Sequence, residues 1–102
     1  MFIVAVTACP TGVAHTYMAR EKLVQVAAKR GIEIKVETQG STGRDNEITA
    51  TDLARADAAI IAADISISGL ERFADLPTLE CSLAEAIKKT GNILDEVVEA
   101  VG

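Results

Sequence analysis

The chain has 102 residues, 49 % of which are apolar, contains no Trp and carries a formal net charge of −5 at neutral pH. A chain of this length is expected to form one domain, over residues 1–102, with a hydrophobic core of its own. The acidic balance argues against a nucleic acid partner, which would require clusters of Lys and Arg, and against an anionic membrane surface.

The N-terminal half of the chain alternates strand and helix patterns. Residues 2–6 (FIVAV) are apolar and β-branched, which predicts a central strand covered on both faces. Residues 16–30 repeat apolar residues at helical spacing and end before Gly31, a C-terminal stop signal. Residues 32–38 (IEIKVET) alternate between apolar and polar, which predicts a half-buried strand nearer an edge. The polar stretch 39–48 is expected to be a surface loop.

The second half opens with a Thr-x-x-Asp capping box, which predicts a short helix over residues 49–55. Residues 58–63 (AAIIAA) predict another buried strand. Residues 64–75 are expected to form a second surface loop. Residues 76–81 (LPTLEC) predict a weaker strand, because Pro77 restricts its ladder bonding to an edge or a strand start.

Two helices are expected to close the chain. Ser82 and Glu85 form a second capping box, and the helix that follows ends before Gly91. Asn92 can cap a last helix. The apolar stripe of that helix is Ile93, Leu94, Val97, Val98 and Val101.

Strands that alternate with helices in this way indicate a parallel sheet with right-handed crossovers. We therefore expect an α/β fold of the Rossmann-like or flavodoxin-like kind. Its small, open, parallel sheet would have four strands in the order 2-1-3-4, with helices on both faces.

The segment ACPTGVAHTYMAR (8–20) carries the candidate chemistry. Ligands of an open parallel sheet bind outside the carboxyl ends of the strands, and Cys9 follows the first strand. The loop 9–15 leads into a helix N-terminus, whose N–H groups and dipole favour an anion, and favour a thiolate over a thiol. Pro10 fixes one φ angle, and Gly12 lets the backbone approach a ligand. The segment predicts a nucleophilic sulfur beside a phosphate-binding loop.

The remaining residues of the segment are compatible with that role. Thr11 and Thr16 offer hydroxyl donors to an anion. Val13 and Ala14 add no charge that would compete with it. His15 can donate a hydrogen bond to a phosphate, although a surface position at a helix start is the commoner role for such a histidine.

Other interpretations stay open. A lone cysteine after a buried strand is most often a small core residue, but a purely structural Cys9 gains nothing from a glycine-bearing loop. Cys81 precedes a capping serine and is expected to be structural. A further hypothesis, ranked third after a phosphoryl carrier and a phosphatase-like enzyme, is a non-catalytic redox module that pairs the two thiols. The residues 40–43 predict a flexible turn, and no Cys or His spacing predicts a zinc or other metal site.

Cysteine-dependent phosphatases provide an instructive contrast. They too place a thiolate after a parallel strand, but they finish the loop with an arginine whose fork binds phosphate. This chain has His15 at that place, and the nearest arginine in sequence is Arg20. The sequence identifies no aspartate near the loop as a general acid. A phosphoryl group on Cys9 should therefore persist until it is passed on, and a phosphatase-like enzyme ranks second to a phosphoryl carrier.

Four segments resemble one known family. Residues 4–19 (VAVTACPTGVAHTYMA) resemble the active-site segment of the fructose-family enzyme IIB domain of the bacterial phosphoenolpyruvate-dependent sugar phosphotransferase system. Residues 35–43 (KVETQGSTG) and 56–73 (ADAAIIAADISISGLERF) resemble the next two blocks of that family, and residues 82–89 (SLAEAIKK) resemble its penultimate helix. The resemblance extends over nearly the whole chain.

The resemblance implies a phosphotransferase that takes a phosphoryl group from a phosphohistidine of an enzyme IIA domain and carries it on Cys9. The acceptor would be a sugar, fructose or a related hexose, bound in the membrane-embedded enzyme IIC. The family's phosphate loop maps onto Pro10, Thr11, Gly12, Val13, Ala14, His15 and Thr16. Residues 66–69 lack the acidic residue expected there, a departure that bears on partner docking, and Cys81 is an extra thiol.

The expected location is cytoplasmic. The N-terminal residues 1–9 lack the basic region of a signal peptide, and no apolar run is long enough to span a bilayer. The domain would reach the inner face of the membrane through enzyme IIC, without inserting into the bilayer itself, and would need no cofactor.

Overall fold

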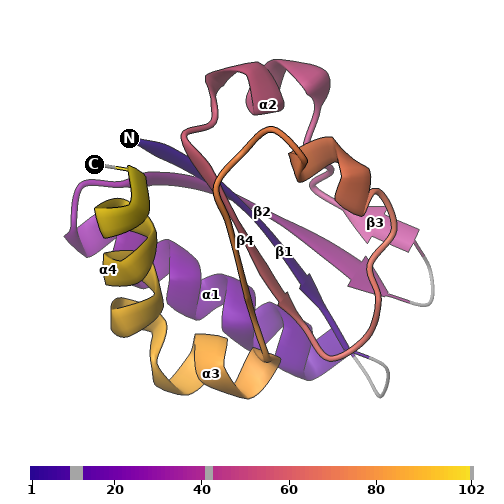
Figure 1. Cartoon of the computed structure of the whole chain (residues 1–102). Helices are drawn as coiled ribbons and strands as arrows, with labels where there is room; N and C mark the ends of the chain where they lie inside the picture. The colour runs from indigo at the N-terminus through magenta and orange to yellow at the C-terminus, as the bar shows by residue number, and fades with distance from the viewer. Residues whose placement is uncertain (10–12, 41–42, 102) are drawn as a thin grey trace.

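The computed structural model describes residues 1–9, 13–40 and 43–101, and it has an α/β architecture built on one twisted sheet (Figure 1). The sheet has five strands in the order β3-β2-β1-β4-β5. The strands are β1 (Phe2–Ala8), β2 (Glu33–Gly40), β3 (Gly43–Asp45), β4 (Ala58–Ala63) and β5 (Thr78–Cys81). Strand β1 pairs in parallel with β2 and β4, and β4 pairs in parallel with β5.

The parallel order 2-1-3-4 predicted from the sequence is confirmed for β2, β1, β4 and β5, but the predicted number of strands is wrong by one. The additional strand, β3, runs antiparallel to the end of β2 and lies inside the stretch 39–48 that was expected to be a loop. Its three residues are all exposed. Backbone ladder bonds, and not burial, hold β3 in place. Its sequence therefore lacks the apolar alternation by which a half-buried strand is predicted.

Helices lie on both faces of the sheet, as predicted. The elements are α1 (Val13–Lys29), α2 (Ala50–Arg55), the short 3₁₀ helix η1 (Leu70–Phe73), α3 (Leu83–Lys88) and α4 (Thr90–Val101). Helices α1, α3 and α4 cover one face, here called the helix face (Figure 1). The opposite face, here called the crossover face, is covered by α2, by η1 and by the chain that leads from β4 to η1.

All seven residues of β1 are buried, because its alternating side chains enter two cores. Ile3 and Ala5 point into the helix-face core, with Leu23 of α1. Val4 points into the crossover-face core, with Phe73 of η1. This two-sided burial explains why the predicted strand over residues 2–6 has no polar alternation.

Several element boundaries differ from the predicted ones, including those of β2, which ends at Gly40 instead of residue 38, and of β5, which begins at Thr78 instead of residue 76. Strand β1 continues to Ala8, and α1 begins at Val13 instead of residue 16. Helix α4 begins at Thr90, so the predicted cap at Asn92 is wrong. The Thr90 hydroxyl donates a hydrogen bond to the carbonyl of Ala86 in α3, which joins the two helices without the break that an N-cap at position 92 would require.

Both predicted capping boxes are confirmed. Thr49 and Asp52 cap α2, and Ser82 and Glu85 cap α3, with both reciprocal hydrogen bonds present in each box. The Ser82 box matters for the site because it fixes where α3 begins, beside the carboxyl ends of the strands.

The substitution Ser82→Ala is expected to lower the free energy of unfolding by about 1 kcal/mol, because the Glu85 N–H loses its acceptor, Ser82 Oγ, at 3.1 Å. Urea denaturation measures this change. Ser82→Asp keeps an acceptor and should restore most of the stability. Equal midpoints for Ser82→Ala and the wild type would show that the box contributes nothing.

Candidate active site at the carboxyl edge of the sheet

Cys9 lies at the carboxyl end of the central strand β1. The residue before it, Ala8, pairs with Gln39 of β2 and with Ala63 of β4, so Cys9 stands between the ends of two neighbouring strands. Its side chain is half-buried and packs against the helix-face core. This is the edge at which open parallel sheets bind their ligands.

The predicted phosphate loop divides into two parts. Three of its residues lie outside the described part of the chain: Pro10, Thr11 and Gly12. The other four belong to the first turn of α1 and not to a loop: Val13, Ala14, His15 and Thr16. Within this turn His15 is exposed, whereas Thr16 is buried. The connection between β1 and α1 is therefore shorter than predicted.

The N-terminus of α1 is electrostatically suited to an anion. Its first turn contains no acidic residue, whereas the first turns of α2 and α3 contain Asp52 and Glu85. The helix is 17 residues long, and aligned peptide dipoles give such a helix about half a positive charge at its N-terminus. Cys9 is four residues before Val13, where this helix begins.

The structure adds Asp64 to the site. Its N–H donates a hydrogen bond to the Ala8 carbonyl at 3.2 Å, which places Asp64 one strand away from Cys9. Its carboxylate oxygen Oδ1 accepts a hydrogen bond from the Leu83 N–H at 3.2 Å. Asp64 thus connects the ends of β1 and β4 with the start of α3. The sequence identified no aspartate near the loop as a general acid, and the structure places Asp64 there; the missed signal was its position directly after a buried parallel strand.

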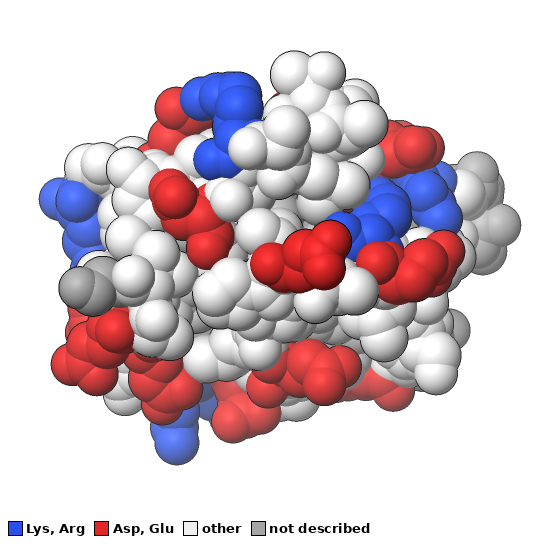
Figure 2. All heavy atoms as spheres, turned by 45° about the horizontal axis from the view of Figure 1, so that its top comes forward, with Lys and Arg blue, Asp and Glu red and all other residues white. Residues whose placement is uncertain are grey.

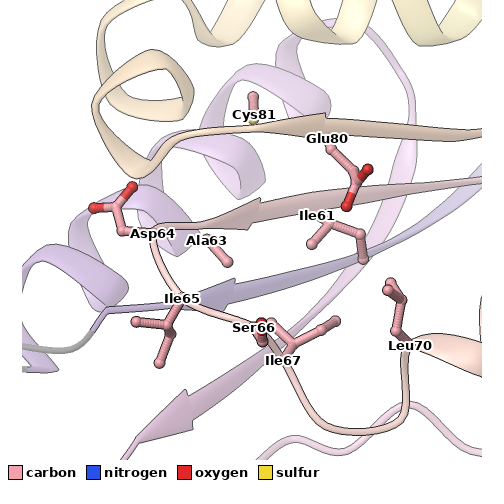
Figure 3. Close-up of a pocket in the computed structure, with 9 residues that line it drawn as sticks. All are labelled: Ile61, Ala63, Asp64, Ile65, Ser66, Ile67, Leu70, Glu80 and Cys81. Carbon is pink, nitrogen blue, oxygen red and sulfur yellow. The ribbon is translucent and has the colours of Figure 1, made fainter.

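Two hollows border Asp64. The one on the helix face has a volume of about 380 Å³, and its lining residues are His15, Met18, Asp64, Leu83, Ala84, Ile87 and Lys88. The one on the crossover face has a volume of about 490 Å³. Figure 3 shows this second hollow, with Ile61, Ile67 and Leu70 around it and Asp64 turned toward the helix face. His15 and Lys88 bring positive or hydrogen-bonding groups to the first hollow, beside Asp64.

Three arginines that a phosphatase-like reaction could recruit have other partners. The Arg20 guanidinium lies over the Tyr17 ring, 4.9 Å from its centroid. Arg44 donates hydrogen bonds to Ser68 Oγ from Nε at 3.1 Å and from Nη2 at 2.8 Å. Arg72 forms a salt bridge with the buried Glu37. None of these three groups takes the place of the phosphate fork that position 15 lacks.

Cys81 has an environment that suppresses thiol reactivity. It is a half-buried free thiol on β5. Burial raises the pKa of the Cys81 thiol to about 11, with further contributions from the carboxylates of Glu85, Asp64 and Glu96. The thiolate is the nucleophilic form, so Cys81 is a poor nucleophile at neutral pH and a poor partner for redox exchange.

The described surface carries mixed charge. On the face shown in Figure 2, acidic side chains are spread widely and basic side chains form small separate groups. Within residues 1–9, 13–40 and 43–101, no helix is both long enough and apolar enough to cross a membrane. The same residues contain no group of three or more His, Cys, Asp or Glu side chains arranged to hold a metal ion.

Comparison with known proteins identifies the family. Residues 4–96 match the family described as the lactose/cellobiose-specific IIB subunit of the phosphotransferase system (PTS). The chain is 50 % identical over 95 residues to the PTS system fructose-like EIIB component 2 of Escherichia coli K12, covering 93 % of this chain and 90 % of that protein. It is 52 % identical over 96 residues to the PTS system fructose-specific EIIB'BC component of the same strain, covering 94 % of this chain but only 17 % of that longer protein.

Solved structures agree with the sequence comparison. A crystal structure of a predicted fructose-specific IIB from E. coli superposes with a TM-score of 0.94 at 36 % identity, covering 99 % of this chain and 89 % of that one. A domain of the fructose-specific IIABC component from Borrelia burgdorferi superposes with a TM-score of 0.89 at 45 % identity, covering 94 % and 91 % of the two chains. The chain belongs to the PTS IIB family, in its fructose branch. The resemblance seen in the sequence is therefore confirmed, and with it the phosphotransferase class.

The environment of Cys81 leads to a prediction about its alkylation. With a pKa of about 11, on the order of a thousandth of the Cys81 thiol is ionised at about pH 8. In a Cys9→Ser variant, the rate of alkylation by iodoacetamide should be slow and should rise about tenfold per pH unit to about pH 10. A plateau near the ordinary thiol pKa, at about pH 8.5, would contradict this environment, and Cys9→Ser/Cys81→Ala is the blank.

Proposed function

We propose that this chain is a phosphoryl carrier that uses Cys9 to relay phosphate from a protein phosphohistidine to a sugar. The observation that carries the proposal is the position of Cys9 at the end of the central strand, before a helix whose first turn contains no acidic residue. Such a place favours both an ionised sulfur and a bound phosphoryl group. Membership of the PTS IIB family supports the proposal.

In the first step, the Cys9 thiolate attacks the phosphorus of a phosphohistidine on an enzyme IIA domain. The S–P bond forms as the N–P bond breaks, and the electron pair of the broken bond returns to the imidazole nitrogen. Both reacting partners are proteins, so the sulfur must be reachable from outside. The half-buried side chain of Cys9 at an open edge of the sheet meets this requirement.

In the second step, a hydroxyl oxygen of a sugar held by the membrane-embedded enzyme IIC attacks the same phosphorus. The O–P bond forms, the S–P bond breaks, and the thiolate leaves with its electron pair while the hydroxyl proton passes to a base of the sugar site. A stabilised thiolate is a good leaving group, so the features that favour attack in the first step also favour release in the second.

The backbone and side chains of seven residues are proposed to hold the phosphoryl group during its stay: Pro10, Thr11, Gly12, Val13, Ala14, His15 and Thr16. Amide N–H groups at a helix start suit phosphate oxygens. His15 lines the helix-face hollow beside Asp64 together with Lys88, and both can offer hydrogen bonds to a phosphate oxygen or to the donor domain.

The names of the relatives suggest the partners. One relative is named as an EIIB'BC component and another as part of an IIABC component, so IIB units occur in one chain with IIC, or with IIA and IIC. We propose fructose or a related hexose as the acceptor. The chain would work in the cytoplasm, at the inner face of the membrane, where enzyme IIC presents the sugar.

Replacement of the nucleophile tests this function. Cys9→Ser should lower the rate of phosphoryl acceptance from a phosphorylated fructose-type IIA domain by at least about a thousandfold, because a serine hydroxyl is not ionised at neutral pH. The measurement is transfer of ³²P from the donor to the chain in single-turnover reactions. Cys81→Ser serves as the matched thiol control and should accept phosphate at the wild-type rate.

Acceptance by Cys9→Ser at the wild-type rate would refute the role of Cys9. Loss of acceptance in Cys81→Ser with an intact fold would show that the phosphoryl group is carried on Cys81 and not on Cys9. Turnover of an aryl phosphate at an ordinary enzymatic rate would instead favour the phosphatase-like alternative.

A further inference from the structure

The crossover from β4 to η1 passes beside Cys9. Residues 64–69, here called the arch, contain no helix or strand and run over the carboxyl ends of β1 and β2 on the crossover face (Figure 1). The first residue of the arch, Asp64, donates its N–H to the carbonyl of Ala8 at 3.2 Å. Because Ala8 directly precedes Cys9, the arch begins next to the proposed nucleophile.

The far end of the arch is bound to the strand next to β1. The Gln39 side chain donates to the Ser68 carbonyl from Nε2 at 3.0 Å and accepts from the Ser68 N–H at Oε1, also at 3.0 Å. Gln39 is paired in register with Ala8. The arch is therefore fixed to Ala8 at one end and to Gln39 at the other. These two residues are paired at the carboxyl edge of the sheet, beside Cys9.

A buried carboxylate holds Gln39 and the chain after the arch. Glu37 is fully buried, and it accepts two parallel bonds from Arg72, at 2.8 and 3.0 Å, and one from Gln39 at 2.8 Å. Burial alone would raise the pKa of Glu37, but the bonds from Arg72, Gln39 and the Ile48 N–H outweigh it and lower that pKa. Glu37 is thus charged at neutral pH.

The Arg72 guanidinium also holds backbone carbonyls of the arch. Its Nε donates to the Gly69 carbonyl at 2.7 Å, and its Nη2 donates to the Ser68 carbonyl at 3.3 Å. Gly69 has φ 76°, and a Cβ atom there would lie 2.6 Å from Arg72 Nε. The arch therefore needs glycine at this position for the guanidinium to approach it.

Stability alone does not account for an ion pair at this place. Apolar side chains of similar volume often replace a buried ion pair without loss of stability. What an apolar pair cannot do is donate to the carbonyls of Ser68 and Gly69 or hold the Gln39 amide. The specific effect of Glu37, Gln39 and Arg72, here called the clamp, is to fix the backbone of the arch.

The arch presents an apolar side chain at the edge of the site. Ile65 is 44 % exposed and follows Asp64, and Figure 3 shows its side chain at the carboxyl end of β1. Leu70, 45 % exposed, lines the same hollow as Ile65. Two exposed apolar side chains around one hollow beside the proposed nucleophile are suited to contact with a protein that must approach it.

We propose that the clamp residues Glu37, Gln39 and Arg72 are positioning residues for phosphoryl transfer, and that they act by fixing the arch against which the phosphohistidine-bearing donor docks. This inference rests on the proposed function. The clamp does not contact the phosphoryl group. It fixes the surface on which the donor binds. Without the clamp the arch would have to be ordered on binding, and that cost would weaken the affinity for the donor and raise KM.

The test is the double variant Glu37→Met/Arg72→Met, which removes both buried charges together. Removing both charges together leaves no unpaired buried charge, but the Ile48 N–H and the Gln39 amide each lose a partner. Its urea midpoint should therefore fall by the cost of those bonds while the chain stays folded. Its kcat/KM for transfer from the phosphorylated IIA domain should fall by roughly ten- to a hundredfold, chiefly through KM, because the loosened arch must be ordered when the donor binds. In a Cys81→Ala background, the alkylation of Cys9 by iodoacetamide should be unchanged, because the sulfur and its loop are not altered.

Lys35→Met is the matched control. Lys35 lies on the same strand and pairs with Asp52 of α2, on the crossover face but away from the arch. Its loss should leave the transfer rate unchanged. If Lys35→Met slows transfer as much as the double variant does, the loss of any ion pair on β2 impairs transfer. That result would overturn the specific role of the clamp.

A pair of glycine variants provides a second test that keeps both charges. Gly69 and Gly31 both have positive φ, 76° and 68°, but a Cβ atom at Gly31 has nothing within 4 Å. Gly69→Ala should raise KM for the donor, whereas Gly31→Ala should not. This pair decides the question if the double variant does not fold.

The outcomes separate the two proposals. Wild-type KM in a folded double variant, or in Gly69→Ala, would overturn the positioning role and leave the phosphoryl carrier intact. Failure of the wild-type chain to accept phosphate from any fructose-type IIA donor would overturn the proposed function and this inference together.

Discussion

The parallel pairing of β1 with β2 and β4 is the constraint on which the site depends. It brings the carboxyl ends of three strands to one edge, so that Cys9, Gln39 and Asp64, which are far apart in sequence, become neighbours. Parallel strands require crossovers, and the helix that returns the chain from β1 begins beside the sulfur. One topological choice thus places Cys9, the proposed nucleophile, beside the helix N-terminus and the arch.

The two cysteines occupy different electrostatic surroundings in the same fold. Cys81 faces burial and three carboxylates, which hold its thiol neutral far above physiological pH. Cys9 precedes a helix whose first turn contains no acidic residue. In the proposed carrier, Cys9 is the reactive sulfur, beside the positive end of the α1 dipole, and Cys81 lies in surroundings that keep its thiol unreactive.

Much of this arrangement was predictable from the sequence, because it depends on local patterns. The apolar run 2–6 and the strand 58–63 predicted two buried strands, and the capping boxes at Thr49 and Ser82 predicted two helix starts. The position of Cys9 after the first strand followed from the same reasoning. Strand β3 was not predictable, because it depends on backbone pairing between distant segments, whereas the position of Asp64 directly after a buried strand was a usable signal in the sequence. The burial of Glu37 could not be predicted either, because in an alternating strand a glutamate is expected to face solvent. Its burial is explained only by its partner Arg72, which is distant in sequence.

Direct mapping of the phosphoryl group tests the central claim most directly. The wild-type chain, phosphorylated by its IIA donor, would be digested under neutral conditions and its peptides sequenced by mass spectrometry. The account predicts a phosphoryl group on the sulfur of Cys9 and none on other side chains. A phosphoryl group found on the imidazole of His15, with Cys9 unmodified, would contradict it.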